Sequence, residues 1–327
     1  MKFLLYLILT ILLMILVSCN NPYENENSTW TEDWIAIIDI DGNNIEYLYK
    51  DGSSCYWVES NDDSLNSKIL ISKSDHVEIM NQDGSDKKVL FESSGNVVCT
   101  NNSQTSFLMV YNDDILSSNI SGSKLLNLTN TSDEVEFDPS YSTSDSLIVF
   151  SSYFDNQEKR INYLKLMNLN KKTETIVLVD STANLISKPI LINNDVIFFF
   201  KYYGNQDDRN GLYRLHIELN EVDFLFEGYV FDIKFNRYSN EILLNIDEYF
   251  CTFSSDLNKY GDIDNSSIVT SPNGEYVSFS RTNSYASLIN WIDNKIIHID
   301  HKFYSPSFNL SSTQFVCTVK RRYPDDF

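Results

Sequence analysis

The chain has 327 residues, of which 42% are hydrophobic and 13% aromatic, with 20 Tyr and 20 Phe. This abundance of β-forming residues provides for a large core and excludes disorder for the body of the chain. The net charge is −21, and the basic cluster Lys320-Arg321-Arg322 lies near the C-terminus, so the composition argues against a nucleic-acid partner.

The first 18 residues form a candidate export signal. Lys2 supplies a positive start, and the segment from Phe3 to Val17 is apolar apart from Thr10. Spanning a bilayer takes about 20 apolar residues, whereas a signal peptide needs about 7–15. The segment therefore predicts a cleaved signal, with an uncleaved N-terminal anchor helix as the alternative.

The end of this segment, Leu16-Val17-Ser18-Cys19, resembles the lipobox of bacterial lipoproteins. The resemblance implies that Cys19 is the lipid attachment site, that its thiol carries a diacylglyceryl group, and that the signal is cut before it. Several acyl chains give stable anchoring, because each buried methylene contributes about 0.8 kcal/mol. We therefore expect a lipid-anchored protein of the bacterial cell envelope, at the outer membrane on its periplasmic or surface side if the cell is Gram-negative.

The residues after Cys19 are polar up to Thr31 and include Pro22, which is typical of a flexible tether. The predicted organisation is a signal peptide at 1–18, the lipidated cysteine and tether at 19–31, a folded domain at 32–320 and a tail at 321–327.

Within the folded domain, one hairpin pattern recurs along the chain: a strand, a tight turn and a second strand. The copies run over 55–71, 98–109, 139–150, 189–198, 233–244, 268–279 and 303–319. A second hairpin pattern, with Gly, Asn or Asp in its turn, follows each copy but the last. These hairpins run over 77–91, 115–128, 161–179, 212–226, 249–262 and 288–299, and a further copy at 34–49 precedes the first. Such turn residues between β-rich segments indicate β-hairpins because the turns need positive φ.

One hairpin of each kind makes a four-stranded unit of the size of a propeller blade. The count predicts an all-β propeller of seven blades, with six or eight as alternatives. The hairpin at 34–49 has no partner before it and the one at 303–319 has none after it. We therefore expect the N- and C-terminal strands to share one blade and close the ring, leaving no open sheet edge.

Two segments carry a family resemblance. The turn Ser271-Pro272-Asn273-Gly274 resembles the Ser-Pro-Asp-Gly turn of TolB-like and WD-like propeller repeats, and Leu128-Thr129-Asn130, Asp138-Pro139 and Phe150-Ser151-Ser152 fit the same repeat. The resemblance implies a propeller fold over most of 34–319. The chain departs from TolB itself in lacking a separate N-terminal α/β domain, in its predicted lipidation and in its seven blades, so TolB's partners are not carried over.

The remaining cysteines, Cys55, Cys99, Cys251 and Cys317, lie widely spaced in strand-like segments. An exported protein permits disulfides, but isolated strand cysteines more often act as small buried hydrophobes, so free buried thiols are favoured.

Candidate metal sites are weak. Asp39-Ile-Asp41-Gly42-Asn43 suggests a calcium loop, but its glycine comes too early for an EF-hand and a turn is favoured. Of the histidines His76, His216, His298 and His301, only the last two are neighbours, and their spacing puts them on opposite faces of a strand. No metal or cofactor site is predicted.

The sequence predicts no catalytic residue. It has no G-x-S-x-G nucleophile elbow, which a propeller-linked serine hydrolase would need. The favoured function is a module that binds a protein or glycan partner, and the alternative is a glycosidase or polysaccharide lyase, whose carboxylate geometry a sequence does not reveal. The expected contact regions are the long loops at Glu59–Lys68, Tyr153–Arg160 and Tyr202–Asn210, all predicted on one rim.

Overall fold

A computed structural model describes residues 31–322 except for 51–53, 60–66, 93–94, 123–124, 157–158, 205–206, 208, 237, 248, 254–256, 263–267, 280–286, 294 and 300–302. The compact unit discussed below spans Asp33–Lys320. The predicted signal peptide, Cys19 and almost all of the predicted tether lie outside the described residues. Within those residues, no helix has the length and apolar character needed to cross a bilayer.

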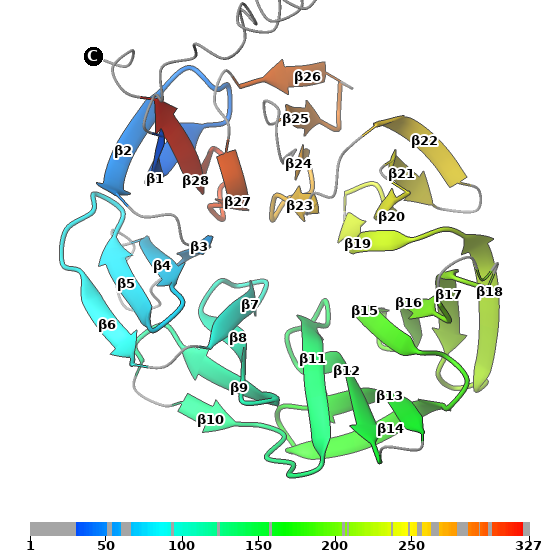
Figure 1. The fold of residues 1–327 in the computed structure, drawn as a ribbon. Helices are drawn as coiled ribbons and strands as arrows, with labels where there is room; N and C mark the ends of the chain where they lie inside the picture. The colour runs from blue at the N-terminus through cyan, green and yellow to red at the C-terminus, as the bar shows by residue number, and fades with distance from the viewer. Residues whose placement is uncertain are drawn as a thin grey trace, which may run out of the picture. The chain divides into compact units, whose positions relative to one another are not determined.

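The described chain forms seven antiparallel sheets of four strands, which are the blades of a β-propeller (Figure 1). Three blades lie in the first half of the chain, and each consists of four consecutive strands. They consist of β3 (Ser54–Val58), β4 (Lys68–Ser72), β5 (Val77–Asn81) and β6 (Lys88–Phe91); β7 (Asn96–Thr100), β8 (Ser106–Tyr111), β9 (Asp114–Asn119) and β10 (Leu125–Asn127); and β11 (Glu134–Tyr141), β12 (Leu147–Asp155), β13 (Arg160–Asn168) and β14 (Thr173–Asp180).

Three more blades continue the same order in the second half. They consist of β15 (Leu185–Ile192), β16 (Val196–Tyr202), β17 (Gly211–His216) and β18 (Glu221–Glu227); β19 (Val230–Asn236), β20 (Glu241–Ile246), β21 (Tyr249–Phe253) and β22 (Leu257–Asp262); and β23 (Ile268–Thr270), β24 (Tyr276–Phe279), β25 (Ser287–Asn290) and β26 (Lys295–His298). The predicted all-β propeller with seven blades is confirmed, and every predicted hairpin falls on a pair of adjacent strands.

The seventh blade joins the two ends of the domain. Its strand order is β2 (Ile45–Lys50), β1 (Thr31–Asp39), β28 (Gln314–Arg322) and β27 (Phe303–Phe308). The amide Nε2 of Gln314 on β28 donates to Asp39 Oδ1 on β1 at 2.8 Å, across the seam between the termini. The prediction that the first and last strands share one blade is confirmed.

The core lies between the blades rather than at the axis. Each of the seven interfaces between neighbouring blades contains its own cluster of buried apolar side chains among the described residues. At the interface between the closing blade and the blade before it, for example, Phe303, Phe308 and Phe315 pack with Leu288. Because a blade has two apolar faces, it is stable only when neighbours cover both of them.

The innermost strands are bent at equivalent positions. Register shifts interrupt the pairing of β7, β11, β15, β19 and β27 with the next strand. In β11 and β15 the shift falls at Asp138-Pro139 and Lys188-Pro189, and the residue before each proline has positive φ, 50° for Asp138 and 54° for Lys188. Bulges redirect side chains and suit the proline, which has no N–H for the ladder.

The prediction that the three long loops share one rim is wrong. Tyr153–Arg160 and Tyr202–Asn210 join the second strand of a blade to the third, whereas Glu59–Lys68 joins a first strand to a second. Because successive strands run in opposite directions, the loop at Glu59 lies at the other end of the blades. There the Glu59 amide donates to the carbonyl of Gln104, in a first-to-second-strand turn, at 2.9 Å.

Candidate functional site

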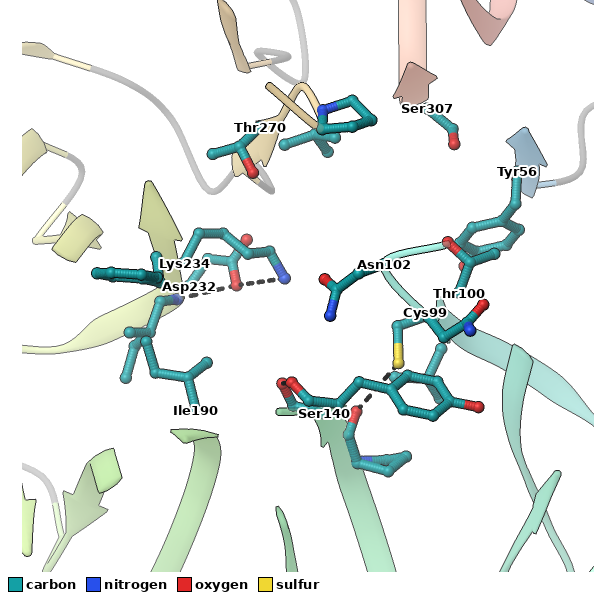
Figure 2. Close-up of a pocket in the computed structure, with 18 of the residues that line it drawn as sticks. Tyr56, Cys99, Thr100, Asn102, Ser140, Ile190, Asp232, Lys234, Thr270 and Ser307 are labelled. Atoms are coloured by element: carbon teal, nitrogen blue, oxygen red, sulfur yellow. Dashed lines mark hydrogen bonds and ion pairs between the residues drawn. The ribbon is translucent and has the colours of Figure 1, made fainter. Parts of the chain in front are cut away.

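A cavity of about 470 Å³ lies on the propeller axis, enclosed by the innermost strands and their hairpin turns. Figure 2 shows Lys234 reaching from β19 toward the middle of this axial cavity, opposite Asn102, while Thr270, Ile190 and Ser140 approach from other blades. The cavity is therefore assembled from residues that are far apart in the sequence.

The two aspartates that line the axial cavity are both bonded to main-chain amides. Asp138 Oδ2 accepts from the amide of Lys188, on the next blade, at 2.9 Å. Asp232 accepts from its own neighbour Ile233 through Oδ1 at 2.9 Å and from Ile268 of the next blade through Oδ2 at 2.8 Å. These carboxylates tie adjacent innermost strands together.

Two lysines bring positive charge to the same wall. The Nζ of Lys234 lies 3.6 Å from Asp232 Oδ1, and the charge of Asp232 raises the pKa of Lys234 against the effect of burial. Lys188 lines the cavity and takes part in no ion pair with another described residue. Lys234 therefore offers an ammonium group at neutral pH, and Lys188 lies on the same wall.

The axial cavity also contains polar groups committed to the scaffold. Gln104 is buried and donates through Nε2 to the carbonyl of Phe308 at 2.7 Å, whereas its Oε1 has no hydrogen-bond partner among the described residues. Tyr56 donates to the carbonyl of Val97 at 2.6 Å. The thiol of Cys99 donates to the carbonyl of Pro139 at 3.5 Å, and burial raises its pKa to about 11, so the thiol is not a nucleophile at neutral pH.

A second cavity, of about 460 Å³, lies beside the first; we call it the aromatic groove. Its walls come from β11, β12, the first residue of β13, β15, β16, and the start of β19 with the residue before it. The lining residues are Val135, Phe137, Asp138, Tyr153, Arg160, Leu185, Ser187, Lys188, Phe200, Tyr229 and Val230. Asp138 and Lys188 line both cavities, so the bulges of β11 and β15 form the wall between them.

Aromatic contacts hold the walls of this groove. The rings of Phe137 and Tyr153 lie 5.9 Å apart, and Tyr229 lies 5.1 Å from Phe200. The guanidinium of Arg160 stacks over Tyr153 at 4.0 Å. Tyr229 is 45% exposed, so one aromatic wall of the groove is open to a ligand.

Two of the three loops predicted as contact regions border the aromatic groove. Tyr153 and Arg160, the first and last residues of one loop, line it directly. Tyr202, at the start of the second loop, packs against Tyr229 at 6.1 Å. The sequence did not predict Lys188 and Tyr229 of the groove or Lys234 of the axial cavity. The repeated X-Pro pair at 138–139 and 188–189 is the one sequence signal near these cavities.

The other predicted sites are settled where the structure describes them. Cys55, Cys251 and Cys317 are buried thiols outside any disulfide, as predicted, whereas Cys99 is also outside any disulfide but only partly buried. The segment around Asp41 is a turn, in which Asp41 Oδ1 accepts from the amide of Asn43 at 3.0 Å.

The histidines have acidic neighbours rather than one another. His76 contacts Asp75 and Glu78 at 2.6 and 2.7 Å, and His216 lies 3.8 Å from Asp223. The side chain of His298 and all of His301 lie outside the description, so their predicted arrangement stays a prediction.

Comparison with known proteins gives matches of structure and none of sequence. No protein-family model matches the chain, and no curated protein sequence matches it. Among solved structures, an oligogalacturonate lyase in complex with manganese aligns over 91% of this chain and 97% of its own, with 8% identity and a TM-score of 0.66. TolB from Acinetobacter baumannii aligns over 83% of this chain and 64% of its own, with 13% identity and a TM-score of 0.52.

The β-propeller domain of Cps50 (Swd1) from Myceliophteria thermophila aligns over 81% of this chain and 95% of its own, with 10% identity and a TM-score of 0.54. At such identities the likeness shows the fold alone. The predicted resemblance to TolB-like and WD-like propellers is thus confirmed for the fold.

Proposed function

We propose that this chain is a lipid-anchored protein of the bacterial cell envelope whose propeller binds an envelope protein or glycan without altering it. One observation carries the choice of binding over catalysis: both carboxylates that line the axial cavity already accept main-chain N–H groups from neighbouring strands. Each carboxylate is thereby held in the wall, whereas glycoside hydrolysis needs two carboxyl groups placed on either side of one scissile bond.

Elimination chemistry is no better supported. A lysine that acts as a base needs a lowered pKa, whereas the charge of Asp232 raises the pKa of Lys234. The pKa of the Cys99 thiol is also raised. Neither Lys234 nor Cys99 is therefore prepared to take a proton from a ligand.

The manganese of the structurally similar lyase does not fit this donor set. The residues that line the axial cavity include no histidine, and their two aspartates are bonded to main-chain amides. Across the described part of the chain, no group of three or more His, Cys, Asp or Glu side chains is placed to hold a metal ion. We derive no step through a metal.

The experiment that tests binding against catalysis uses the full-length protein in detergent. Envelope polysaccharides and solubilised envelope proteins are incubated with it, and both retention on the protein and the masses of the recovered glycans are measured. Binding with unchanged glycan masses is the expected result. Cleaved products, whether hydrated or unsaturated, would replace the binding proposal with the glycan-active alternative.

The anchor is tested separately. Cells that express the wild-type chain should incorporate radiolabelled palmitate into it, and the Cys19→Ala variant should not, because the acyl groups attach at this residue. Cys55→Ala is the matched control and should label like the wild type. Equal labelling of wild type and Cys19→Ala would rule out lipid attachment at Cys19.

A further inference from the structure

We propose that the aromatic groove binds a short glycan that carries one or two carboxylates. The sugar rings lie against the aromatic walls formed by Tyr153 and Tyr229, and the carboxylates lie at Arg160 and Lys188. This inference rests on the proposed binding function and names the ligand class for it.

The walls of the groove suit sugar rings. Phe137 and Tyr153 form one aromatic wall and Tyr229 with Phe200 forms another, and both belong to a cavity of about 460 Å³. This volume is in the usual range for small-ligand sites, and aromatic faces with a few polar groups are their usual lining. A protein partner would instead need about 800 Å² of contact surface, which such a groove does not offer by itself.

The cations of the groove are available for a ligand. Arg160 donates to Asp155 Oδ2 at 3.5 Å and to the carbonyl of Asn184 at 3.4 Å, both near the upper limit for a hydrogen bond. Its guanidinium is already fixed over Tyr153, which leaves its remaining N–H groups for a planar carboxylate. Lys188 has no ion pair with any other described residue.

The carboxylate that lines the groove, Asp138, is held in the wall by the backbone. Asp138 Oδ2 accepts from the main-chain amide of Lys188 at 2.9 Å, and this bond holds it in the wall. The groove thus holds two cations, of which Arg160 has an ion pair with Asp155 at 3.5 Å, in a molecule whose net charge is −21. Because that net charge repels long polyanions, the complementary ligand is a short glycan with few charges.

The backbone supports a functional role for Lys188. Its φ of 54° is uncommon for a residue with a side chain, as is the 50° of Asp138, which lines the same groove. Such strain costs on the order of 1 kcal/mol and persists where the surrounding structure requires it, often at ligand sites. Here the bulge places Lys188 where it lines both the aromatic groove and the axial cavity.

The test uses one ligand in two forms: tri- to pentameric oligouronides, and the same oligouronides after chemical reduction of their carboxyl groups. Calorimetric titration of the full-length protein in detergent should show tighter binding of the acidic form, by about tenfold or more per carboxylate held, and the difference should shrink as salt is added.

Variants separate the two parts of the site. Lys188→Met and Arg160→Met should each remove about tenfold of affinity for the acidic form and leave the reduced form unchanged. Tyr229→Ala should weaken both forms. Lys171→Met, at an exposed lysine in the turn after β13, is the matched control and should change neither. Thermal unfolding of each variant verifies that it is folded.

The outcomes are distinguishable. Equal binding of both forms overturns the assignment of an acidic ligand but leaves a binding propeller. Loss of acid preference in Lys171→Met as well as Lys188→Met, or no binding of either form, overturns the assignment of the groove. Cleavage of the oligouronide, detected by mass, overturns the proposed non-catalytic function while acid recognition stands.

Discussion

The carboxyl group of Glu136, on β11, is fully buried and only partly satisfied. Its Oε1 accepts from the hydroxyl of Thr131 at 2.6 Å, whereas Oε2 has no hydrogen-bond partner within the described chain. Burial raises the pKa of Glu136 to about 7 from an ordinary 4.5, against the opposing effects of Thr131 and Lys165. The group is thus half protonated near neutrality.

The raised pKa of Glu136 predicts a pH-dependent loss of stability. The folded state holds this proton up to about pH 7 and the unfolded state releases it near 4.5, so the free energy of unfolding falls across this window and is flat above it. Glu136→Gln stays neutral and should be more stable than the wild type at pH 8, by about 3 kcal/mol, and similar at pH 4.5.

Urea unfolding of both proteins from pH 4.5 to 8 measures this difference. Glu221→Gln, at an exposed glutamate on β18, serves as the control and should keep the wild-type slope. Parallel pH profiles for wild type and Glu136→Gln would show that Glu136 titrates normally.

At the scale of strands, side chains of one blade satisfy main-chain amides of the next. Asp138 and Asp232 do this at two junctions, and Ser307 Oγ does so at a third by accepting from the amide of Trp57 at 2.8 Å. The innermost strands of different blades are not paired in one sheet. These bonds therefore supply partners that a neighbouring strand would otherwise give.

Asp232 allows a direct measurement of one such junction. Asp232→Ala leaves the buried amide of Ile268 without its partner and should lower the free energy of unfolding by about 1–3 kcal/mol. Asp232→Asn keeps one acceptor oxygen and should lose less. Chemical denaturation measures both, and an unchanged midpoint for Asp232→Ala would show that the bond adds nothing to stability.

A buried ion pair joins two blades further from the axis. Lys201 Nζ on β16 lies 2.7 Å from Asp180 Oδ2, at the end of β14, and both side chains are buried. Burial raises the pKa of Asp180, but hydrogen bonds from Lys201 and from Thr182 outweigh this and hold its pKa well below the ordinary value. The stability that Asp180 contributes is therefore present at neutral pH and is lost only in acid.

Replacing either partner of this pair should destabilise the protein, and the two losses should not add. Lys201→Met leaves a buried carboxylate without its cation and should lower the free energy of unfolding by about 3 kcal/mol. Asp180→Asn should cost a similar amount, and the double variant less than the sum of the two. A double-mutant cycle from urea denaturation gives the coupling free energy between Lys201 and Asp180. Strictly additive losses would contradict a stabilising interaction between them.

For the whole molecule, closure of the ring is the decisive feature. β27 and β28 at the end of the domain complete the blade that β1 and β2 begin. Removing them would expose the edge of β1 and the apolar side chains of β25 that pack against the closing blade.

Truncation tests this closure. A chain without residues 303–327 should lose cooperative unfolding and bind a hydrophobic dye, whereas a chain that begins at residue 31 should unfold like the intact protein. Thermal unfolding with size-exclusion chromatography measures both. A monomeric, cooperatively folded 303–327 deletion would show that six blades suffice.

The fold was predictable because its signals are local. Ser271-Pro272-Asn273-Gly274 forms the expected turn, with Gly274 at a φ of 75° and its amide donating to the carbonyl of Ser271 at 2.8 Å. A turn and the strands on either side of it lie within about a dozen residues, so each hairpin can be recognised by itself. The number of blades and the shared closing blade then follow from counting.

The candidate sites were not predictable because their parts are distant in sequence. Arg160, Lys188 and Tyr229 meet in one groove, although nothing in their spacing links them. The error about the loop at Glu59–Lys68 has a related cause, since which end of a blade a loop occupies depends on the strands that it joins. Likewise the acidic residues Asp138 and Asp232 resemble catalytic candidates until their main-chain partners are known.

The sequence by itself thus determined the strand pattern, the blade count and the ring closure, and it predicts the lipid anchor at Cys19. Only the tertiary structure decided which carboxylates are bonded to main-chain amides, which cations line a cavity and which aromatic rings face a common groove. The physical reason is that hairpin formation depends on neighbours along the chain, whereas the availability of a side chain depends on what the folded ring places beside it.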